Sequence, residues 1–182
     1  MSWQPVIERV SETLARFPAQ AMAATLDRAE GFAPGSALPP LWHWLHCLKL
    51  YPLDQAGPDG HQALGHFLPP LALPRRMWAG GRFTFHRPLR IGAAVTRESC
   101  VAGVAEKQGR SGPIAFVTVA HRWSDAGGPL IDEEQDIVYR RADAPAAAVV
   151  AAPGGETLHR AMTAGPVLLF RYSALTFNGH RI

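Results

Sequence analysis

The chain has 182 residues, of which 47% are hydrophobic and 18% are charged, and its formal net charge is +3. This length suits one domain, or one domain and part of another, and the composition excludes a disordered chain. No apolar run is long enough to span a bilayer, and the N-terminus lacks the basic and apolar regions of a signal peptide. We therefore expect a cytoplasmic protein with a substantial hydrophobic core and no membrane partner.

The cysteines and the basic residues narrow the function further. Cys47 and Cys100 do not have the spacing of a metal or redox site, so we interpret them as reduced thiols. Sixteen of the eighteen basic residues are arginines, which suit bidentate contact with phosphate. They are spread along the chain, and no lysine-rich run or nucleic-acid-binding module occurs. We expect no nucleic-acid partner.

The first part of the chain predicts one helix. Residues 1–17 are mixed and suggest an entry segment with a short strand or a turn. Pro18 suits the first position of a helix, and residues 19–29 are rich in strong helix formers. Met22, Leu26 and Ala29 fall on one face of that helix. It is our candidate for a central helix packed against a sheet.

Aromatic residues and histidines dominate residues 41–50. If this segment is a strand, its alternation places Trp42, Trp44 and His46 on one face. Such residues could line a cofactor pocket, but we favour core residues with satisfied imidazoles. Residues 51–74 hold five prolines and three glycines and predict a long irregular connection. Loops of that length are usually functional or mobile, and this one could cover a substrate.

The segment RRMWAGG at residues 75–81 has two interpretations, which the sequence alone leaves open. It could contact a phosphate or a similar ligand, or it could be a basic turn in which Gly80 and Gly81 precede a strand. From Arg82 onward the pattern is β, with further strands predicted at residues 91–104, 114–123 and 130–140 and turns between them. Several strands at hairpin spacing after one helix predict an antiparallel sheet packed on that helix, an α+β domain.

A linker and a second domain are predicted at the end of the chain. The segment ADAPAAAVVAAPGG at residues 142–155 is rich in Ala, Pro and Gly and nearly uncharged, which is typical of a linker. We therefore predict an N-terminal domain at residues 1–141, a linker at 142–156, and the start of a C-terminal domain at 157–182.

The last sixteen residues, VLLFRYSALTFNGHRI, change character along their length. The apolar run at 167–170 follows the turn-forming pair Gly165-Pro166 and predicts a strand. The next eleven positions then hold seven polar or ionisable residues, namely Arg171, Tyr172, Ser173, Thr176, Asn178, His180 and Arg181. A plain core strand does not need that density, whereas a reaction site at the end of a rigid element does.

The string RYSALTFNGHRI resembles the signature of MaoC-like acyl-CoA hydratases, in particular the mesaconyl-CoA (3-methylfumaryl-CoA) hydratase branch. Further similarity lies in LPPLWHWL, DGH, RRMWAGGRFTFHRPL and KQGRSGP, at residues 38–45, 59–61, 75–89 and 107–113. The resemblance implies a double hot-dog fold, in which each antiparallel sheet wraps around a central helix. By this resemblance, the chain holds the first hot-dog unit completely and only the beginning of the second.

The same resemblance implies an acyl-CoA substrate, no metal or redox cofactor, and a homo-oligomer, with a dimer expected. Members of the branch continue with His-Tyr-Asp after this string, whereas the present sequence ends at Ile182. We therefore expect the native protein to continue past that residue. Without the histidine that follows in the family, we expect this chain to have little activity by itself.

Hydration of an enoyl thioester requires an activated water, a proton for the α-carbon, and stabilisation of the thioester oxygen. Many of the related enzymes use an Asp and a His separated by four residues, and Asn178 occupies the position of the Asp. An amide cannot act as a general base, but it can orient the water or the thioester. His180 is the nearest titratable group and is a candidate for proton transfer.

The resemblance also implies residues that bind the substrate. Arg171 and Arg181 could anchor a carboxylate of a dicarboxylic acyl group or form structural ion pairs, and Tyr172 and Ser173 are expected to fix the loop. The candidate contacts to coenzyme A are Arg75, Arg76, Trp78, Gly80 and Gly81.

Three functions stay open on the sequence. The first is a hydro-lyase acting on an acyl-CoA thioester. The second is a non-catalytic acyl-CoA-binding module, which Asn in place of Asp would suit. The third is a thioesterase on the same fold, although the tail lacks the carboxylate that such an enzyme would use.

Overall fold

The computed structural model describes residues 3–109, 112–143, 151, 154–155, 157–158 and 161–179. In this part of the chain the elements are β1 (Glu8–Thr13), α1 (Arg16–Thr25), η1 (Trp42–Leu45), η2 (Leu53–Gln55), β2 (Arg75–Phe85), β3 (Ala94–Gly109), β4 (Gly112–Asp125), β5 (Gly128–Arg140) and α2 (Pro166–Leu175), where η marks a 3-10 helix. No helix among the described residues is long and apolar enough to cross a membrane.

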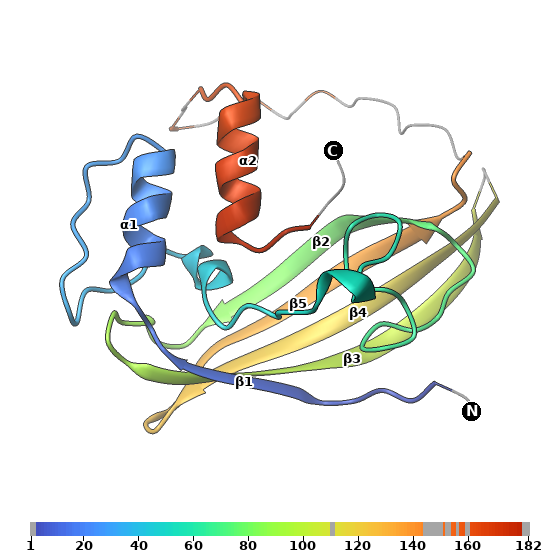
Figure 1. Cartoon of the computed structure of the whole chain (residues 1–182), viewed down its shortest axis with the longest axis horizontal. Helices are drawn as coiled ribbons and strands as arrows, with labels where there is room; N and C mark the ends of the chain where they lie inside the picture. The colour runs from blue at the N-terminus through green and yellow to red at the C-terminus, as the bar shows by residue number, and fades with distance from the viewer. Residues whose placement is uncertain are drawn as a thin grey trace.

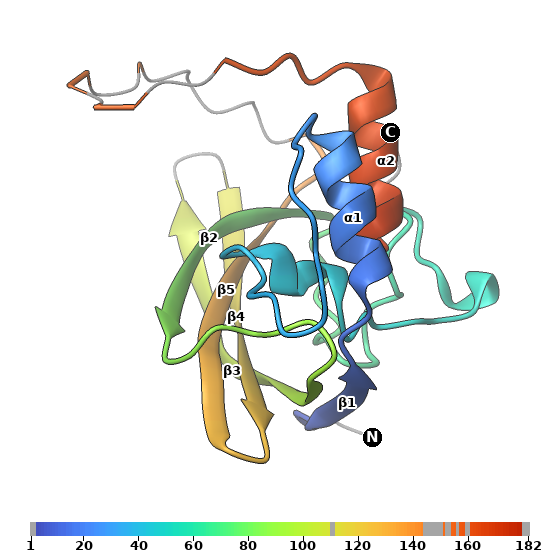
Figure 2. The same ribbon diagram turned by 90° about the vertical axis from the view of Figure 1, so that its left-hand side faces the viewer.

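The strands form one antiparallel sheet with the order β1-β3-β4-β5-β2 (Figure 1). The sheet is strongly curved, and α1, η1 and α2 all lie on its inner side, while no helix of the described residues covers the outer side (Figure 2). This arrangement confirms the predicted α+β class and the hot-dog fold. The described sheet makes up a single hot-dog unit.

The strand predictions are largely confirmed, with boundaries that differ. The β4–β5 turn lies where Gly127 and Gly128 predict it, and Gly128 has the left-handed φ of 110° that such a tight turn requires. The predicted link at residues 107–113 is shorter than expected, because Lys107 pairs with Ile114 and Gly109 with Gly112. Residues 75–81 belong to β2, so the interpretation of RRMWAGG as a turn is wrong.

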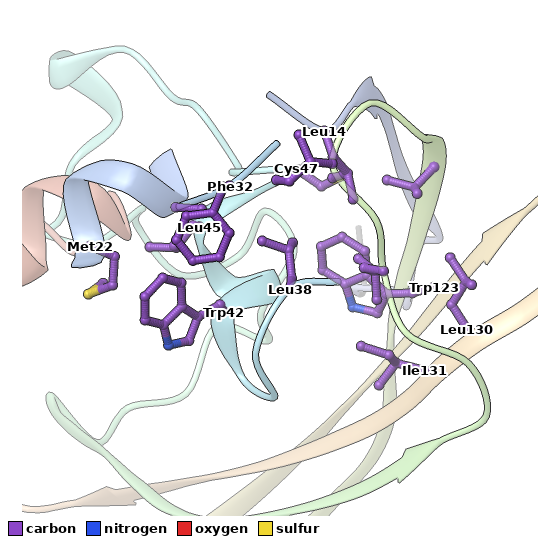
Figure 3. Packing of buried hydrophobic residues seen from close by; sticks show 14 of the residues in the cluster. Leu14, Met22, Phe32, Leu38, Trp42, Leu45, Cys47, Trp123, Leu130 and Ile131 are labelled. Carbon is purple, nitrogen blue, oxygen red and sulfur yellow. The ribbon is translucent and has the colours of Figure 1, made fainter. Parts of the chain in front are cut away.

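Two hydrophobic clusters fill the inner face of the sheet. The larger joins α1, η1 and the sheet, and Figure 3 shows Met22 and Trp42 facing each other at one side of it, with Trp123 and Ile131 at the other. Trp123 is 1% exposed. Burying one large apolar side chain stabilises the fold by about 1.5–3 kcal/mol. The second cluster packs Phe67, from the long connection after η2, against Val117 and Tyr139 of the sheet.

The helix predicted at residues 19–29 forms at Arg16–Thr25 and ends earlier than expected. Asp27 has a left-handed φ of 51°, which stops the helix, and Ala29 is exposed. Met22 is buried as predicted. The helix packs against η1 and α2. It is connected to the sheet mainly through η1, whose His43 contacts β2 and whose Trp44 bonds to β5.

The strand prediction for residues 167–170 is wrong, and the segment at residues 41–50, which would show alternation if it were a strand, is not one. Residues Trp42–Leu45 form η1, which starts after Leu41 with a left-handed φ of 71°. Residues 167–170 belong to α2, which begins with Pro166 at the first helical position and Gly165 as its N-cap. In both views α2 lies beside α1.

Candidate functional site

The described part of the polar signature, from Arg171 to Asn178, lies on α2 and on the turn that follows it. Phe177 has a left-handed φ of 49°, and its N–H donates to the carbonyl of Ala174 at 3.3 Å. The N–H of Asn178 donates to the carbonyl of Ser173 at 2.8 Å. These two bonds form a Schellman motif, which ends the helix and reverses the chain. The motif leaves Asn178 exposed just beyond the end of a rigid helix.

This turn packs against residues 51–60, which we call the Tyr51–Gly60 loop. The ring of Phe177 lies edge-on to the ring of Tyr51, with centroids 5.8 Å apart and planes at 73°. The Tyr51 hydroxyl donates to the carbonyl of Gly60 at 2.9 Å. Gly179 sits so close to the loop that a Cβ there would overlap the Gly60 carbonyl oxygen and lie 2.9 Å from the Tyr51 hydroxyl. The loop therefore fixes the turn on which Asn178 lies.

An ion pair holds the far end of that loop to the sheet. Asp59 accepts two hydrogen bonds from the guanidinium of Arg76 on β2, one of them at 2.9 Å, and Arg76 also donates to the carbonyl of Gln62 at 3.0 Å. The Arg76 side chain is 10% exposed. Burial raises the pKa of Asp59, but the hydrogen bonds and the charge of Arg76 outweigh burial and hold that pKa below its usual value. Asp59 is therefore held in its ionised form by its pairing with Arg76.

The structure brings several of the predicted site residues together on α2 and its turn. Arg171 and Tyr172 are exposed and Ser173 is half-buried. Asn178 lies three residues after the end of α2. Burial raises the pKa of the Tyr172 phenol. The predicted residues His180 and Arg181 lie outside the described residues.

Strand β2 separates the predicted coenzyme A contacts. Successive side chains on a strand point to opposite faces. Arg76 is opposite the buried Tyr139 and turns inward to Asp59, whereas its neighbour Arg75 is exposed. Trp78 is 61% exposed, and the register shift between Trp78 and Gly80 marks a β-bulge. A Cβ on Gly81 would lie 3.2 Å from the Trp78 and Phe83 rings, so Gly81 gives these rings their room.

A second polar cluster, which the sequence did not reveal, lies beneath η1. The Glu133 carboxylate accepts hydrogen bonds from Trp44 Nε1 at 2.8 Å, from His43 Nε2 at 3.1 Å and from Gln135 Nε2 at 2.5 Å. His43 and Glu133 are 1% and 2% exposed. The partner of His43, Glu133, lies ninety positions further along the chain.

The interpretation of the Trp and His side chains of residues 41–50 as core holds for Trp42, His43 and His46, which are buried, whereas Trp44 is half-buried. The imidazole of His43 is satisfied by Glu133, but that of His46 is bonded only at Nδ1, to Glu12, and its buried Nε2 has no partner among the described residues.

The cluster continues along the same row of the sheet. His121 lies opposite Glu133, and its Nδ1 is 2.7 Å from the hydroxyl of the buried Ser99. Burial lowers the pKa of His121 to about 4. Burial acts to raise the pKa of Glu133, but the hydrogen bond from His43 and the charge of His121 lower it to about 2. This side of the sheet therefore holds a buried carboxylate beside a histidine that is neutral at neutral pH.

Two cavities of the molecule border the Glu133 cluster and lie away from the predicted site residues on α2. The larger one, of about 500 Å³, is an open groove on the outer face of the sheet, where Arg82, Arg122 and Asp132 form part of its lining. A smaller one, of about 290 Å³, lies beside His43 and Phe85. Neither is lined by a residue of α2 or of its turn. Among the described residues, no group of three or more His, Cys, Asp or Glu side chains is arranged to hold a metal ion.

Comparison with known proteins assigns the chain to a family. A profile described as hydroxyacyl-thioester dehydratase type 2 matches residues 41–182. The chain is 46% identical over 187 residues to the mesaconyl-C(4)-CoA hydratase of Chloroflexus aurantiacus, and the match covers all of this chain and 66% of that protein. This chain thus spans slightly less than two thirds of the length of that relative.

Solved structures share the fold at low sequence identity. A MaoC-like dehydratase aligns with a TM-score of 0.63 and 11% identity, covering 98% of this chain and 67% of the other. The ChsH1-ChsH2 complex from Mycobacterium tuberculosis aligns with a TM-score of 0.52 and 14% identity, covering 75% of this chain and 89% of the other. These likenesses agree with the hot-dog topology, and the profile and the relative agree with the resemblance carried by the terminal signature. The chain belongs to the hydroxyacyl-thioester dehydratase type 2 family.

Proposed function

We propose that the protein is a hydro-lyase that adds water to an enoyl-CoA thioester, or removes it from the corresponding 3-hydroxyacyl-CoA. The relative's own substrate, a mesaconyl-CoA, suggests a dicarboxylic acyl group. The observation that carries the proposal is the exposed Asn178, held at the end of α2 by a Schellman turn that docks on the Tyr51–Gly60 loop. Such a placement suits a group that must meet a small substrate with fixed geometry.

Asn178 would orient the reactants. Its amide oxygen can accept a hydrogen bond from the attacking water, and its amide nitrogen can donate one to the thioester oxygen. A well-placed donor to an oxygen that gains charge in the transition state contributes about 3–4 kcal/mol. The amide does not remove the proton of the water, so this role falls to a histidine, either His180 or the one that follows the signature in the family.

The remaining residues of the signature would bind the acyl group. Arg171, which is exposed on α2, can pair with the second carboxylate of a dicarboxylic substrate, and Arg181 is proposed for the same role. Tyr172 and Ser173 lie on the same helix and would line the approach to Asn178.

We assign the coenzyme A portion to the edge formed by β2. Arg75 and Trp78 are both exposed at this edge, although their side chains point to opposite faces of the sheet, and Gly80 and Gly81 allow a ligand to approach the backbone closely. Arg76 is committed to Asp59 and Gln62, which supports a structural role and not a phosphate contact. Coenzyme A enters as part of the substrate, and the reaction we propose uses no metal or redox cofactor.

We further propose a cytoplasmic homodimer. In the described sheet β2 (Arg75–Phe85) is an edge strand and pairs only with β5. A long edge strand is usually covered, and a second copy related by a two-fold axis would continue the sheet across it. Sedimentation equilibrium at micromolar concentration should give twice the mass of one chain. A monomer at that concentration would contradict the dimer.

The test of the function is a hydration assay. Loss of the conjugated enoyl-thioester absorbance is followed with mesaconyl-CoA and with crotonyl-CoA, using this chain and a form extended through the next histidine. We expect activity in the extended form and a preference for mesaconyl-CoA. Activity in neither form, with acyl-CoA still bound, would favour the binding module. Release of free thiol instead of hydration would favour the thioesterase.

The role of Arg171 can be separated from general damage. Arg171→Gln should raise KM for mesaconyl-CoA about tenfold or more, because a desolvated ion pair to the substrate carboxylate is lost, and should leave KM for crotonyl-CoA nearly unchanged. Arg122→Gln is the matched control, since that arginine is exposed on the outer face of the sheet. Equal effects of Arg171→Gln on both substrates would contradict the assignment.

A further inference from the structure

The turn that carries Asn178 is not held by α2 alone. The Schellman motif requires Phe177 to adopt a left-handed φ of 49°, which a residue with a large side chain rarely adopts. Such a conformation persists only where the surroundings hold it. The contact that holds it is the Tyr51 ring, which meets the Phe177 ring edge-on. The geometry of Asn178 therefore depends on a residue more than one hundred positions earlier in the chain.

The contact between Gly60 and Gly179 is the tightest point of this arrangement. A Cβ at Gly179 would overlap the carbonyl oxygen of Gly60, which is a backbone atom that cannot rotate away. That same oxygen accepts the hydrogen bond of the Tyr51 hydroxyl at 2.9 Å. Gly60 itself has a left-handed φ of 86°, which only glycine adopts readily. The two glycines thus fit backbone against backbone.

The loop is in turn fixed to the sheet. Asp59 precedes Gly60 and is held by the guanidinium of Arg76, and its Oδ1 also accepts the N–H of His61 at 3.2 Å. Arg76 comes from β2, and its side chain is almost buried. A continuous series of contacts therefore runs from β2 through Arg76, Asp59 and Gly60 to the turn at Gly179.

We propose that Tyr51, Asp59 and Arg76 are positioning residues for Asn178, and that the first hot-dog unit sets the geometry of the site through the contact between Gly60 and Gly179. This inference rests on the proposed hydratase function. It assigns to the DGH segment at residues 59–61 a role that needs no contact with substrate. Asp59 acts as an anchor for the loop and not as an acid or base.

The experiment uses the full-length native protein and compares two glycine substitutions. Gly179→Ala should push the turn away from the loop and lower kcat about 10- to 100-fold with KM changed by less than about threefold, because a displacement of about 1 Å at a reacting centre has this effect. Gly31→Ala is the matched control, since nothing lies within 4 Å of a Cβ at that position and its φ is not left-handed. It should keep kcat within about twofold of the wild type.

Asp59→Asn tests the anchor without adding bulk. It should lower kcat about tenfold and leave the pH profile of kcat unchanged in shape, whereas the loss of an acid or base would remove one limb of the profile. The double variant with Gly179→Ala should be no slower than Gly179→Ala alone by more than about twofold, because both changes release the same contact. Multiplication of the two separate effects in the double variant would overturn the proposal.

A readout independent of activity is the hydrogen exchange of the backbone N–H of Asn178, which donates to the Ser173 carbonyl. We expect exchange about tenfold faster or more in Asp59→Asn and no change in Gly31→Ala. If the native protein hydrates no acyl-CoA but the exchange rises, the positioning is supported and the proposed function fails. If kcat and the exchange both stay at wild-type values in Asp59→Asn and Gly179→Ala, the positioning is overturned and the function stands.

Discussion

Three side chains donate to the Glu133 carboxylate, two from η1 and one from β5. His43 and Trp44 belong to η1, and Gln135 lies two residues along β5. A buried carboxylate is costly unless hydrogen bonds satisfy its oxygens. Here they are satisfied, and η1 is thereby fixed over the sheet. No periodicity could have predicted this cluster, because it depends on which residue of β5 faces η1.

Glu133→Gln should destabilise the protein by about 1–3 kcal/mol, because the new amide N–H₂ faces donors and at least one buried donor loses its acceptor. Chemical denaturation measures the free energy of unfolding. Glu134→Gln is the matched control. The Glu133 side chain is 1% exposed, whereas the Glu134 side chain is 47% exposed and pairs with Arg82 on the outer face. The control should stay within about 0.5 kcal/mol of the wild type. Equal effects would contradict the role of Glu133.

His121 makes the fold sensitive to acid. Its folded pKa is lowered by burial to about 4 from an ordinary value of 6.5, with Glu133 opposing this shift and Arg97 and His43 adding to it. As pH falls below about 6.5, the unfolded chain takes up a proton that the folded chain refuses until about pH 4. Stability is therefore lost across this window. The loss from His121 alone is on the order of 3 kcal/mol.

The free energy of unfolding should thus fall between pH 6.5 and pH 4 in the wild type and fall less steeply in His121→Gln. Urea denaturation at several pH values measures both curves. Below pH 4.5 the lowered pKa of Glu133 adds a further loss in the same direction, since the unfolded chain protonates this carboxylate while the folded chain keeps it ionised until about pH 2. Parallel curves for the two proteins between pH 6.5 and pH 4 would refute the role of His121.

At the level of elements, α2 shows why a short apolar run is ambiguous. The run at 167–170 is as suitable for a strand as for a helix, and most of its side chains are exposed in the structure. The local sequence did contain a helical signal, because Gly165 suits an N-cap and Pro166 suits the first position of the ten-residue helix that follows. The hairpins were easier to predict, because Gly127-Gly128 and the apolar, β-branched run at residues 114–119 leave little choice.

The packing of α2 itself against the larger hydrophobic cluster should depend on one side chain. Leu175 packs against the larger hydrophobic cluster, whereas Leu169 is 46% exposed. Leu175→Ala should weaken the attachment by about 1–2 kcal/mol, less than for a fully buried leucine, and should speed amide exchange in α2 about 5- to 30-fold. Leu169→Ala should leave that exchange nearly unchanged. Similar exchange in the two variants would show that α2 is held by other contacts.

At the scale of the whole molecule, the first unit holds nearly all of its own core. Apart from Leu175, every residue of the two hydrophobic clusters precedes residue 143. The family resemblance and the alternation of the strands were enough to predict this unit and its α+β class. The position of the C-terminal turn against the Tyr51–Gly60 loop could not be predicted, because it is a contact between distant segments with no periodic signal.

A chain that ends at Asp143 should therefore fold by itself. It should unfold in one cooperative thermal transition, with Tm lower than that of the 182-residue chain by about 2–8 °C, because it loses only the packing of α2. Near-ultraviolet circular dichroism follows the buried tryptophans through the transition. A broad transition without a cooperative midpoint would contradict the domain boundary proposed at residues 142–156.

The close fit of Gly60 against Gly179 has a thermodynamic consequence for the whole protein. A contact shared by two segments links their equilibria, and the coupling free energy is the same in both directions. If the Tyr51–Gly60 loop orders the turn that carries Asn178, then a ligand that orders this turn must also order the loop. Substrate bound at Asn178 should therefore protect residues 51–60 from proteases, although it need not touch any of them.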